Sequence, residues 1–365
     1  MAGEIREPKL THVTVVGRVI PLDSESYMHL VLLAYKFRKV LIKATKMYAK
    51  GINRITIVKE VTKELNLRYA DTIYKLAKLI VEGAKCNNSN PLKVKIRKLF
   101  IASRGFTVNK GNRNIRLLSS NELEINILWK GWIRFKVLFG RKYIPLVNEL
   151  VKKALAKKLS YTAKIAFKNG NVYLHVSVPI ELYLKYFSKG KAEGKLIAGF
   201  DLNSDRINMV IVDKYGIIRD VKTEWFPEVT SHGFPRNKAH TLRLQALAKL
   251  LDYAYHCSVE VVVFEDLERI KKRRFTMSRT ANRKITRFPK RKLLKHAVVM
   301  AMKYGFKVHL VNPANTSKLG EKIGEKLGLD KHTASAYILT LKYLGVANLI
   351  SCNPSSQRNQ TTINY

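Results

Sequence analysis

The pattern of hydrophobic and polar residues predicts that the N-terminal half combines strands with inserted helices. Residues 10–20 are rich in β-branched residues and predict a strand. From about Ser26 to Ala49, hydrophobic residues recur three and four positions apart, which predicts an amphipathic helix capped by Asp23 or Ser24. Two shorter amphipathic stretches follow, near residues 54–66 and 70–82. The helices either only pack as a bundle or also contact nucleic acid through their lysines, and the pattern leaves both open.

Beyond Pro91 the hydrophobic period becomes that of strands. Hydrophobic and polar residues alternate over roughly 123–137, which predicts a hairpin. A second hairpin is predicted over 164–178, because Asn169-Gly170 suits a type I′ turn between two alternating runs. Residues 91–118 carry eight Lys and Arg and no acid, which indicates either a solvated loop or a surface that contacts phosphates.

The C-terminal half alternates strands and helices in the manner of an α/β domain. A polar stretch at residues 188–195 predicts a linker that leads into it. Strands are predicted near residues 196–202, 207–212, 217–222, 259–264 and 307–311, and helices near 238–256, 291–304 and 331–345. No internal repeat interrupts this order.

Together these patterns predict an α+β multidomain fold. The N-terminal half is expected to be a β-barrel-like domain with a helical insertion, and the C-terminal half an α/β domain. The predicted boundaries are residues 1–24 and 91–187 for the barrel, 25–90 for the helical insertion, 188–350 for the α/β domain and 351–365 for a polar, disordered tail.

The net charge of the chain indicates the kind of partner that it binds. The chain has 365 residues, with 68 Lys and Arg against 27 Asp and Glu, so its formal net charge is +41. Hydrophobic residues make up 46%, which is enough to build cores, so the cations must cover the surfaces of folded domains. Nucleic acid is therefore the predicted partner, and an anionic membrane surface is the less favoured alternative.

Cysteine usage and the N-terminal sequence restrict the cellular setting. Cys86, Cys257 and Cys352 are scattered and form no CxxC pair, which argues against a disulfide framework and a cysteine-rich zinc site. The N-terminus has no apolar signal region, and no run reaches about 18 uncharged apolar residues. A cytoplasmic protein with no membrane partner is expected, and its oligomeric state is not predicted.

Three acidic residues stand at the ends of predicted elements. Asp201 interrupts the apolar strand near 196–202, where an uncompensated carboxylate costs several kcal/mol. Glu265 ends the next buried strand, and Asp330 opens the last helix. Acids in this order can converge on one divalent-metal site. The alternatives are a helix N-cap for Asp330 and a surface pair at the strand end for Glu265 with Asp266.

A site of this kind suits phosphodiester hydrolysis. Hard cations such as Mg²⁺ or Mn²⁺ prefer carboxylate oxygens, and several negative charges are needed to hold them beside a phosphate. Metal ions then activate water and stabilise the leaving oxygen. Asp201, Glu265 and Asp330 are therefore the candidate metal ligands and catalytic residues.

The order of motifs resembles that of a known family. The chain contains, in sequence, GFDLN, VVVFEDL, VNPANTSKLG and DKHTASAYIL. This order is similar to the RuvC-type, RNase H-like nuclease half of TnpB, the transposon-encoded relative of type V CRISPR effectors. The resemblance covers about 196–345 and continues more weakly over the N-terminal half, where it implies a wedge barrel with a recognition insert. It implies an RNA-guided, Mg²⁺-dependent DNA endonuclease of a mobile element, with target DNA and guide RNA as partners.

Several positions depart from the family pattern. TnpB proteins usually carry a zinc ribbon before the third acid, whereas no cysteine lies between Thr316 and Asp330, so no zinc is expected. His332 stands where a second Asp is common, and Asn203 where Gly is common. Both are secondary site candidates. His332 is either a proton carrier near the metals or an ordinary histidine at a helix start.

In the segment that stands in place of the zinc ribbon, the sequence predicts a short helix. Within residues 318–329, Leu319, Ile323 and Leu327 recur every four positions, and Gly328 can end the helix. Gly320 and Gly324 argue against this assignment, because glycine weakens helices.

A strongly basic segment follows the Glu265 strand. Residues 271–295 contain twelve Lys and Arg and no acid, interleaved with Phe275 and Phe288. This composition predicts contacts with phosphates and bases, against the alternatives of a solvated loop or a localisation signal. The candidate nucleic-acid-binding residues are Lys271, Lys272, Arg273, Arg274, Arg279, Arg283, Arg287, Lys290, Arg291 and Lys292.

Two other functions stay open at this point. One is a transposon-derived nucleic-acid-binding protein that no longer cuts. The other is a RuvC-like nuclease that needs no guide. The complete set of three acids favours an enzyme, and the large half outside the nuclease region favours a guide-binding protein.

Overall fold

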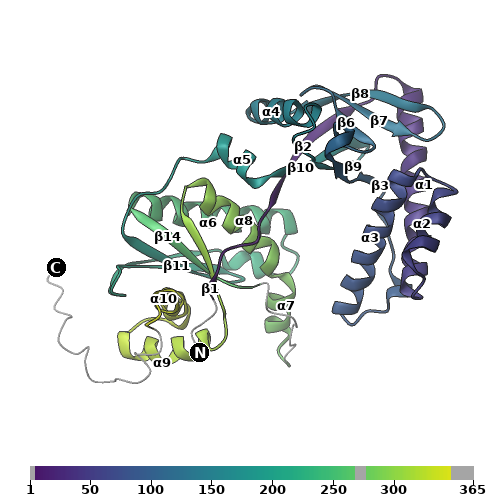
Figure 1. Ribbon diagram of the computed structural model, residues 1–365. Coiled ribbons are helices and arrows are strands. Elements are labelled where there is room, and N and C mark those ends of the chain that lie inside the picture. The colour runs from purple at the N-terminus through teal and green to yellow at the C-terminus, as the bar shows by residue number, and fades with distance from the viewer. Residues whose placement is uncertain (1–4, 268–276, 347–365) are drawn as a thin grey trace. The chain divides into compact units, whose positions relative to one another are not determined.

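The protein divides into two compact units (Figure 1). The computed structural model describes residues 5–267 and 277–346, so the predicted tail at 351–365 lies outside the described residues. One unit comprises residues 11–186, and the other joins residues 1–10 to the chain from 187 onwards. The sequence-based division kept residues 1–24 together. In the structure, strand β1 (Ile5–Arg6) instead pairs with a strand of the C-terminal unit.

An antiparallel sheet of seven strands forms the centre of the N-terminal unit, in the order β3-β9-β10-β2-β8-β7-β6. Both predicted hairpins are confirmed, as β7–β8 and β9–β10, and Asn169 and Gly170 have the positive φ angles that a type I′ turn requires. The strands are β2 (His12–Ile20), β3 (Phe100–Ser103), β6 (Ile115–Leu117), β7 (Glu122–Ile127), β8 (Gly131–Phe139), β9 (Thr162–Lys168) and β10 (Asn171–Pro179).

Side-chain hydrogen bonds and one short pair of strands connect the two edges of this sheet. In the part of the chain described here, β3 and β6 do not pair with each other. Asn112 Nδ2 donates to the Ser103 carbonyl (3.0 Å), and the Asn114 backbone N–H donates to Ser103 Oγ (3.1 Å). All three residues are fully buried. The short strands β4 (Gly105–Phe106) and β5 (Gly111–Asn112) lie in the same connection. The sheet is therefore a half-barrel, less closed than the predicted barrel.

Three helices are inserted between β2 and β3, as predicted: α1 (Ser24–Ala49), α2 (Arg54–Thr62) and α3 (Leu67–Cys86). The Asp23 side chain caps α1 by accepting a hydrogen bond from the Ser26 N–H (2.6 Å). Helices α4 (Ile144–Leu155) and α5 (Ile180–Phe187) were not predicted. Three short 3₁₀ turns complete this unit, at Pro91–Lys93, Thr107–Asn109 and Arg141–Tyr143.

The C-terminal unit is built on a six-stranded mixed sheet in the order β1-β15-β14-β11-β12-β13. Strands β11, β14 and β15 are parallel, and the other pairings are antiparallel. The predicted strands are confirmed within a few residues. Their bounds are β11 (Leu196–Leu202), β12 (Arg206–Val212), β13 (Ile218–Trp225), β14 (Val259–Glu265) and β15 (Lys307–Val311).

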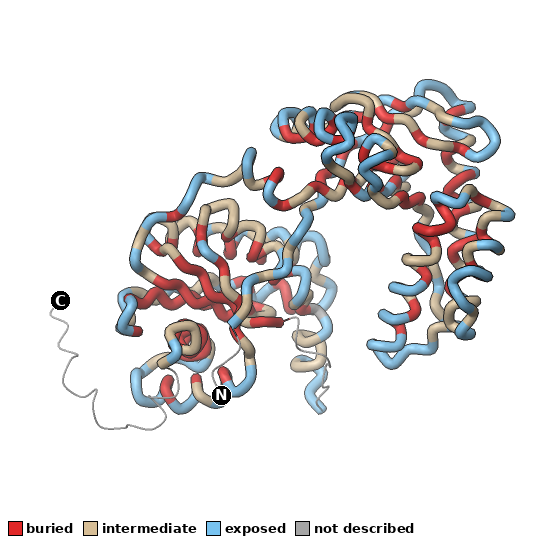
Figure 2. The backbone as a smooth tube through the Cα atoms, in the orientation of Figure 1, coloured by how far each residue is buried: buried red, intermediate tan, exposed pale blue. Residues whose placement is uncertain are grey.

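Helices cover both faces of this sheet. Phe200 and Phe264 point to the core shared with α6 (Arg236–His256) and α8 (Lys290–Lys303). Ile197 and Val263 point to the opposite core, shared with α9 (Thr316–Leu327) and α10 (Lys331–Leu344). Figure 2 shows the resulting burial of the central strands. A further helix, α7 (Arg279–Arg287), was not predicted, and a 3₁₀ turn spans Pro227–Thr230.

The predicted linker at 188–195 is packed against the C-terminal unit. The Lys189 N–H donates to the Lys303 carbonyl (2.8 Å), and the Ala192 N–H donates to the Gly305 carbonyl (3.1 Å). Ala192 is buried. This segment lacks helix and strand, but it is part of the folded unit. Among the described residues, no helix is both long and apolar enough to pass through a membrane.

Candidate active site

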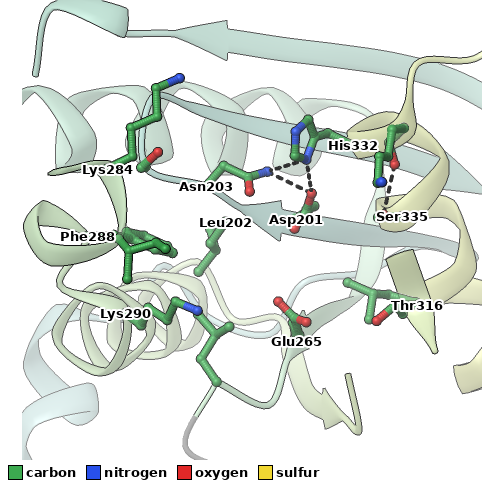
Figure 3. Close-up of a pocket in the computed structure, with 15 residues that line it drawn as sticks. Asp201, Leu202, Asn203, Glu265, Lys284, Phe288, Lys290, Thr316, His332 and Ser335 are labelled. Carbon is green, nitrogen blue, oxygen red and sulfur yellow. Dashed lines mark hydrogen bonds and ion pairs between the residues drawn. The ribbon is translucent and has the colours of Figure 1, made fainter. Parts of the chain in front are cut away.

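Two of the three predicted acids meet at the ends of neighbouring strands. In the parallel pair β11–β14, Phe200 lies opposite Phe264, so Asp201 and Glu265 are the next residues on each strand. Both line a pocket of about 340 Å³ on the side of the sheet that α10 covers, as Figure 3 shows. The sequence pattern placed each acid at a strand end. The register of the sheet brings the two together.

A glycine in β11 lets α10 approach this pocket. A Cβ atom at Gly199 would lie 2.3 Å from the Ala336 carbonyl oxygen, which is closer than atoms can pack. Because Gly199 has no side chain, the backbone of α10 rests directly on the strand. The first turn of α10 then carries His332 to Asp201.

Polar side chains hold the Asp201 carboxylate in place. Asn203 Nδ2 donates to Asp201 Oδ2 (2.7 Å), and His332 Nδ1 lies 3.1 Å from the same oxygen and 3.0 Å from Asn203 Nδ2 (Figure 3). Asp201 is only 8% exposed. Among the described residues it has no ion pair with lysine or arginine, and its side-chain hydrogen-bonding partners are Asn203 and His332.

The Glu265 carboxylate lies in an unfavourable electrostatic environment. Burial raises the pKa of Glu265 to about 7, the charge of Asp201 adds to this shift, and Lys290 and Lys342 oppose it. Two neighbouring carboxylates with this much negative potential fit a hard divalent cation, which would satisfy both. The donor set present here therefore agrees with the Mg²⁺ or Mn²⁺ expected from the sequence.

Asp330 lies at the start of α10 and acts as its N-cap. Its carboxylate accepts hydrogen bonds from the backbone N–H groups of His332 (3.0 Å) and Thr333 (3.3 Å), and from the Thr333 hydroxyl. Burial raises the pKa of Asp330, but these hydrogen bonds outweigh it and hold the pKa below its ordinary value. Asp330 does not line the pocket, and the described residues contain no group of three His, Cys, Asp or Glu placed to hold a metal.

The residue after Glu265 has a different role. Asp266 is 1% exposed, and the Arg6 guanidinium binds both of its oxygens at 2.8 Å. This bidentate pair fastens β1 to the sheet. The alternative that Glu265 and Asp266 form a surface pair is therefore wrong.

Comparison with known proteins places the chain in a family. It is 40% identical over 351 residues to "Uncharacterized protein SSO2105" of Saccharolobus solfataricus, a match that covers 92% of this chain and 93% of that protein. The chain belongs to the SSO2105 family. The family profile described as "SSO2105 N-terminal domain" matches residues 12–188. An "Uncharacterized protein" of Aeropyrum pernix is 30% identical over 212 residues, 53% of this chain and 57% of that protein.

Solved structures also resemble this SSO2105-family chain. A Cas12f1 chain from a complex with sgRNA and target DNA has a TM-score of 0.47 at 14% identity, covering 91% of this chain and 82% of that one. Thermus thermophilus RuvC in complex with a Holliday junction has a TM-score of 0.29 at 16% identity, covering 42% of this chain and 96% of RuvC.

Lysines surround the acid pocket of this SSO2105-family member. Lys284, Lys290 and Lys331 all line it. Lys284 Nζ is bound to Asp205 Oδ2 (2.6 Å) and Lys331 Nζ to Glu321 Oε1 (3.2 Å). The charge of Lys290 acts on Glu265. A pocket with acids inside and cations around it can hold both a metal and a phosphate.

The predicted nucleic-acid-binding residues fall into two groups. Lys271, Lys272, Arg273 and Arg274 lie outside the described residues. Arg279, Arg283 and Arg287 belong to α7, and Lys290, Arg291 and Lys292 to the first turn of α8. Lys290 of this second group lines the acid pocket. Arg279, Arg283 and Lys292 line a separate cavity.

Sequence reasoning missed Arg243. This residue is 2% exposed, and its Nε and Nη2 atoms donate to the Ser204 carbonyl at the wall of the acid pocket (3.2 and 2.8 Å). The sequence did contain a signal. Arg243 lies on the apolar face of α6 with Ala239, Ala246 and Leu250, where burying a cation costs free energy unless a partner compensates it.

The segment that replaces the zinc ribbon forms a helix, as predicted. In α9, Ile323 is 8% exposed, whereas Leu327 is 43% exposed and does not reach the core. Gly328 ends the helix in the left-handed conformation. A Cβ atom at Gly324 would lie 2.6 Å from the Leu329 carbonyl oxygen and 3.3 Å from Ala334 Cβ. The glycine that weakens the helix in isolation therefore permits its close contact with α10.

Proposed function

We propose that this chain is a divalent-metal-dependent nuclease whose active site is the pocket of Asp201 and Glu265. The observation that carries the proposal is the pairing of two carboxylates at adjacent strand ends, without a lysine or arginine ion pair on Asp201 among the described residues. Such an arrangement destabilises the apo protein, and perturbed groups of this kind concentrate at functional sites. Of the lysines that line the pocket, Lys284 and Lys331 are bound to acids, so Lys290 would provide the positive charge that a phosphodiester needs.

Asp201 and Glu265 would hold the cation, with Asp330 as the third ligand that the resemblance to TnpB suggests. When bound, Mg²⁺ or Mn²⁺ would polarise the phosphoryl group and activate the attacking water. Asn203 and His332 hold the Asp201 carboxylate in one orientation, which fixes the side of the pocket that a substrate meets. Lys290 would contact a phosphate oxygen beside Glu265.

His332 is the proposed proton carrier. Its Nδ1 atom is engaged with Asp201 and Asn203, which orients the ring. Its side chain is 36% exposed. Nε2 would then give a proton to the leaving oxygen of the cleaved strand.

The finer proposal is DNA cleavage directed by a guide RNA, in a protein of a mobile element. The motif order shared with TnpB, the net charge of +41 and a separate unit of residues 11–186 support it. The cytoplasm would be its location, in contact with the nucleoid. Sequencing of the RNA that copurifies with the protein tests the guide: one enriched RNA species is expected.

Cleavage assays test the nuclease itself. Purified protein with its copurified RNA should cut matching plasmid DNA in Mg²⁺ or Mn²⁺ and should stop in EDTA. Cleavage that continues in EDTA would contradict the metal site. Protein stripped of RNA that still cuts would instead indicate a nuclease that needs no guide.

One observation favours a second function. The Asp330 carboxylate caps α10, and the described residues hold no three-ligand group. A chain in which Asp330 only caps its helix would bind nucleic acid without cutting it. The distinguishing result is tight binding with no cleavage in either metal, under conditions that include the copurified RNA.

A further inference from the structure

A second cavity in the C-terminal unit lies between α6, α7 and α8 and measures about 810 Å³. Among the described residues, five cationic side chains line it, and none of the lining residues is acidic. These are Arg236 and Arg243 of α6, Arg279 and Arg283 of α7, and Lys292 of α8. Five cations around one hollow repel one another, so an anion inside the hollow would lower the energy of the folded unit.

Arg243 is a buried cation whose hydrogen bonds, among the described residues, go to a neutral group. The residue is 2% exposed, and its Nε and Nη2 atoms both donate to the neutral carbonyl of Ser204. The nearby Asp205 carboxylate is bound instead by Lys284 (2.6 Å) and Arg206 (3.5 Å). Burial lowers the pKa of Arg243 and Asp205 opposes this shift. A buried cation without a hydrogen-bonded carboxylate is costly unless a ligand completes it.

Two further polar atoms of the lining are buried without a partner. Within the described residues, neither His240 Nδ1 nor Arg283 Nε makes a hydrogen bond. Arg283 Nε always carries a proton, so it is a donor that lacks an acceptor. Buried polar groups in native proteins are almost always paired. Arg283 Nε therefore indicates that a hydrogen-bond acceptor belongs in this cavity, and His240 Nδ1 can donate to the same group in the tautomer that carries its proton there.

Helix α7 separates this cavity from the acid pocket. Its residues Lys284 and Ile285 line the acid pocket, whereas Arg279, Arg283 and Thr286 line the cavity. The two sites thus lie on opposite sides of one helix, a separation of about 10–12 Å. Along one strand of nucleic acid, phosphates recur roughly every 3.4 Å of duplex length, so a few nucleotides span this distance.

We propose that this cavity binds a phosphate group of the nucleic-acid strand, a few nucleotides from the phosphodiester held in the acid pocket. The inference rests on the proposed function in that the strand is the one to be cut. A phosphate has several acceptor oxygens and matches the fork of an arginine side chain. It would satisfy Arg243, Arg283 and His240 together.

The test removes the two exposed arginines of the lining, because truncating the buried Arg243 endangers folding. Arg236→Ala with Arg279→Ala is compared with Lys295→Ala with Lys326→Ala, which removes two exposed cations that line neither site. Binding of a fluorescein-labelled single-stranded oligonucleotide is measured by anisotropy over a range of KCl concentrations in EDTA. The arginine variant should bind roughly tenfold more weakly. Its salt slope should fall by about 0.7 for each phosphate that the variant no longer neutralises.

Three results would overturn the proposal. The arginine variant could bind like wild type, or the lysine control could lose as much affinity and slope. The cavity could also take free phosphate only: inorganic phosphate would then raise the melting temperature of wild type and not of the arginine variant, with oligonucleotide binding unchanged. Because every assay is run in EDTA, and can be repeated in an Asp201→Asn background, the outcome does not depend on cleavage. A protein that never cuts could still show this site.

Discussion

Asp71 of the N-terminal unit and Asp201 of the C-terminal unit are buried to the same degree, but their surroundings differ. Asp71 in α3 is 9% exposed, and Asp201 in β11 is 8% exposed. Asp71 is bound by three arginines, Arg54 at 3.1 Å, Arg104 at 3.1 Å and Arg113 at 3.3 Å. Asp201 has Asn203 and His332 as hydrogen-bonding neighbours, and the like charge of Glu265 nearby.

Under the proposed function, the difference separates an acid that builds the fold from an acid that binds a ligand. Three arginines around Asp71 tie α2 and the residues that flank β4 and β5 to α3, so this carboxylate is neutralised by the protein itself. Among the described residues, Asp201 and Glu265 form no salt bridge with lysine or arginine, although Lys290 and Lys342 act on Glu265 from a greater distance. In a protein with a charge of +41, an acid pair without a lysine or arginine salt bridge among the described residues supports the proposed cation site.

The largest effect is expected when the carboxylates of Asp201 and Glu265 are replaced by amides. Asp201→Asn and Glu265→Gln should each lower the cleavage rate by at least about a hundredfold, because a metal ligand is lost. Oligonucleotide affinity should change little, since lysines and arginines supply it. The control is Glu260→Gln on the same strand, whose carboxylate pairs with Lys307 (2.6 Å) away from the pocket. Normal cleavage by the Asp201→Asn protein would contradict the assignment of Asp201 as a metal ligand.

The choice of substitution can separate the two roles of Asp330, as helix N-cap and as proposed metal ligand. Asparagine caps helices about as well as aspartate, so Asp330→Asn should keep the melting temperature and still abolish cleavage if the charge binds metal. Asp330→Ala should in addition lose about 1 kcal/mol of stability. Cleavage and thermal melts measured side by side decide the matter. An Asp330→Asn protein with full activity would leave the residue as a cap only.

Substitutions in helix α9 test whether its packing against α10 holds Asp330 and His332 in place. Ile323→Asp should cost at least about 3 kcal/mol in the free energy of unfolding, because it places a charge in the core beneath α10. Cleavage should fall with it, since α10 carries His332 and Asp330. Leu327→Asp on the same helix is the control, as Leu327 is 43% exposed. Urea denaturation of both variants gives the comparison. Equal stability of the two would show that α9 does not support the site.

The acid of the first unit should behave in the opposite way. Asp71→Asn is expected to destabilise the protein by about 1–3 kcal/mol, because charged hydrogen bonds to three arginines are weakened. Cleavage per folded molecule should stay unchanged. Glu82→Gln on the same helix serves as control: its pair with Lys78 is long (3.7 Å) and half exposed, so the loss should be at most about 0.5 kcal/mol. If Asp71→Asn reduced cleavage while keeping full stability, the assignment of a structural role to Asp71 and a catalytic role to Asp201 would be wrong.

What the sequence could predict was local. The Asp23 cap, the Asn169-Gly170 turn and the helix that contains Ile323 depend on neighbouring residues, and the structure contains all three. The pairing of Arg6 with Asp266 joins residues 260 positions apart, and no periodicity reveals it. The cavity beside α7 likewise depends on which helix faces meet.

The acid site shows the same limit. Strand ends were predictable, so Asp201 and Glu265 could be named from the sequence. That they lie at neighbouring positions follows from the register of β11 against β14, which a single sequence does not reveal. The role of Asp330 stayed divided for a further reason, because a helix N-cap and a metal ligand use the same residue type at the same place.

The smallest expected effect concerns zinc. No cysteine lies between Thr316 and Asp330, and Cys86 and Cys257 belong to different units of the described chain. Direct contact between α9 and α10, through Gly324 and the Ile323 side chain, joins the elements that a zinc ribbon would otherwise connect. Elemental analysis of the purified protein should therefore find no stoichiometric zinc, and a zinc-selective chelator should leave its melting temperature unchanged. One zinc per chain, or a chelator that lowers the melting temperature, would mean that packing alone does not hold α9 on α10.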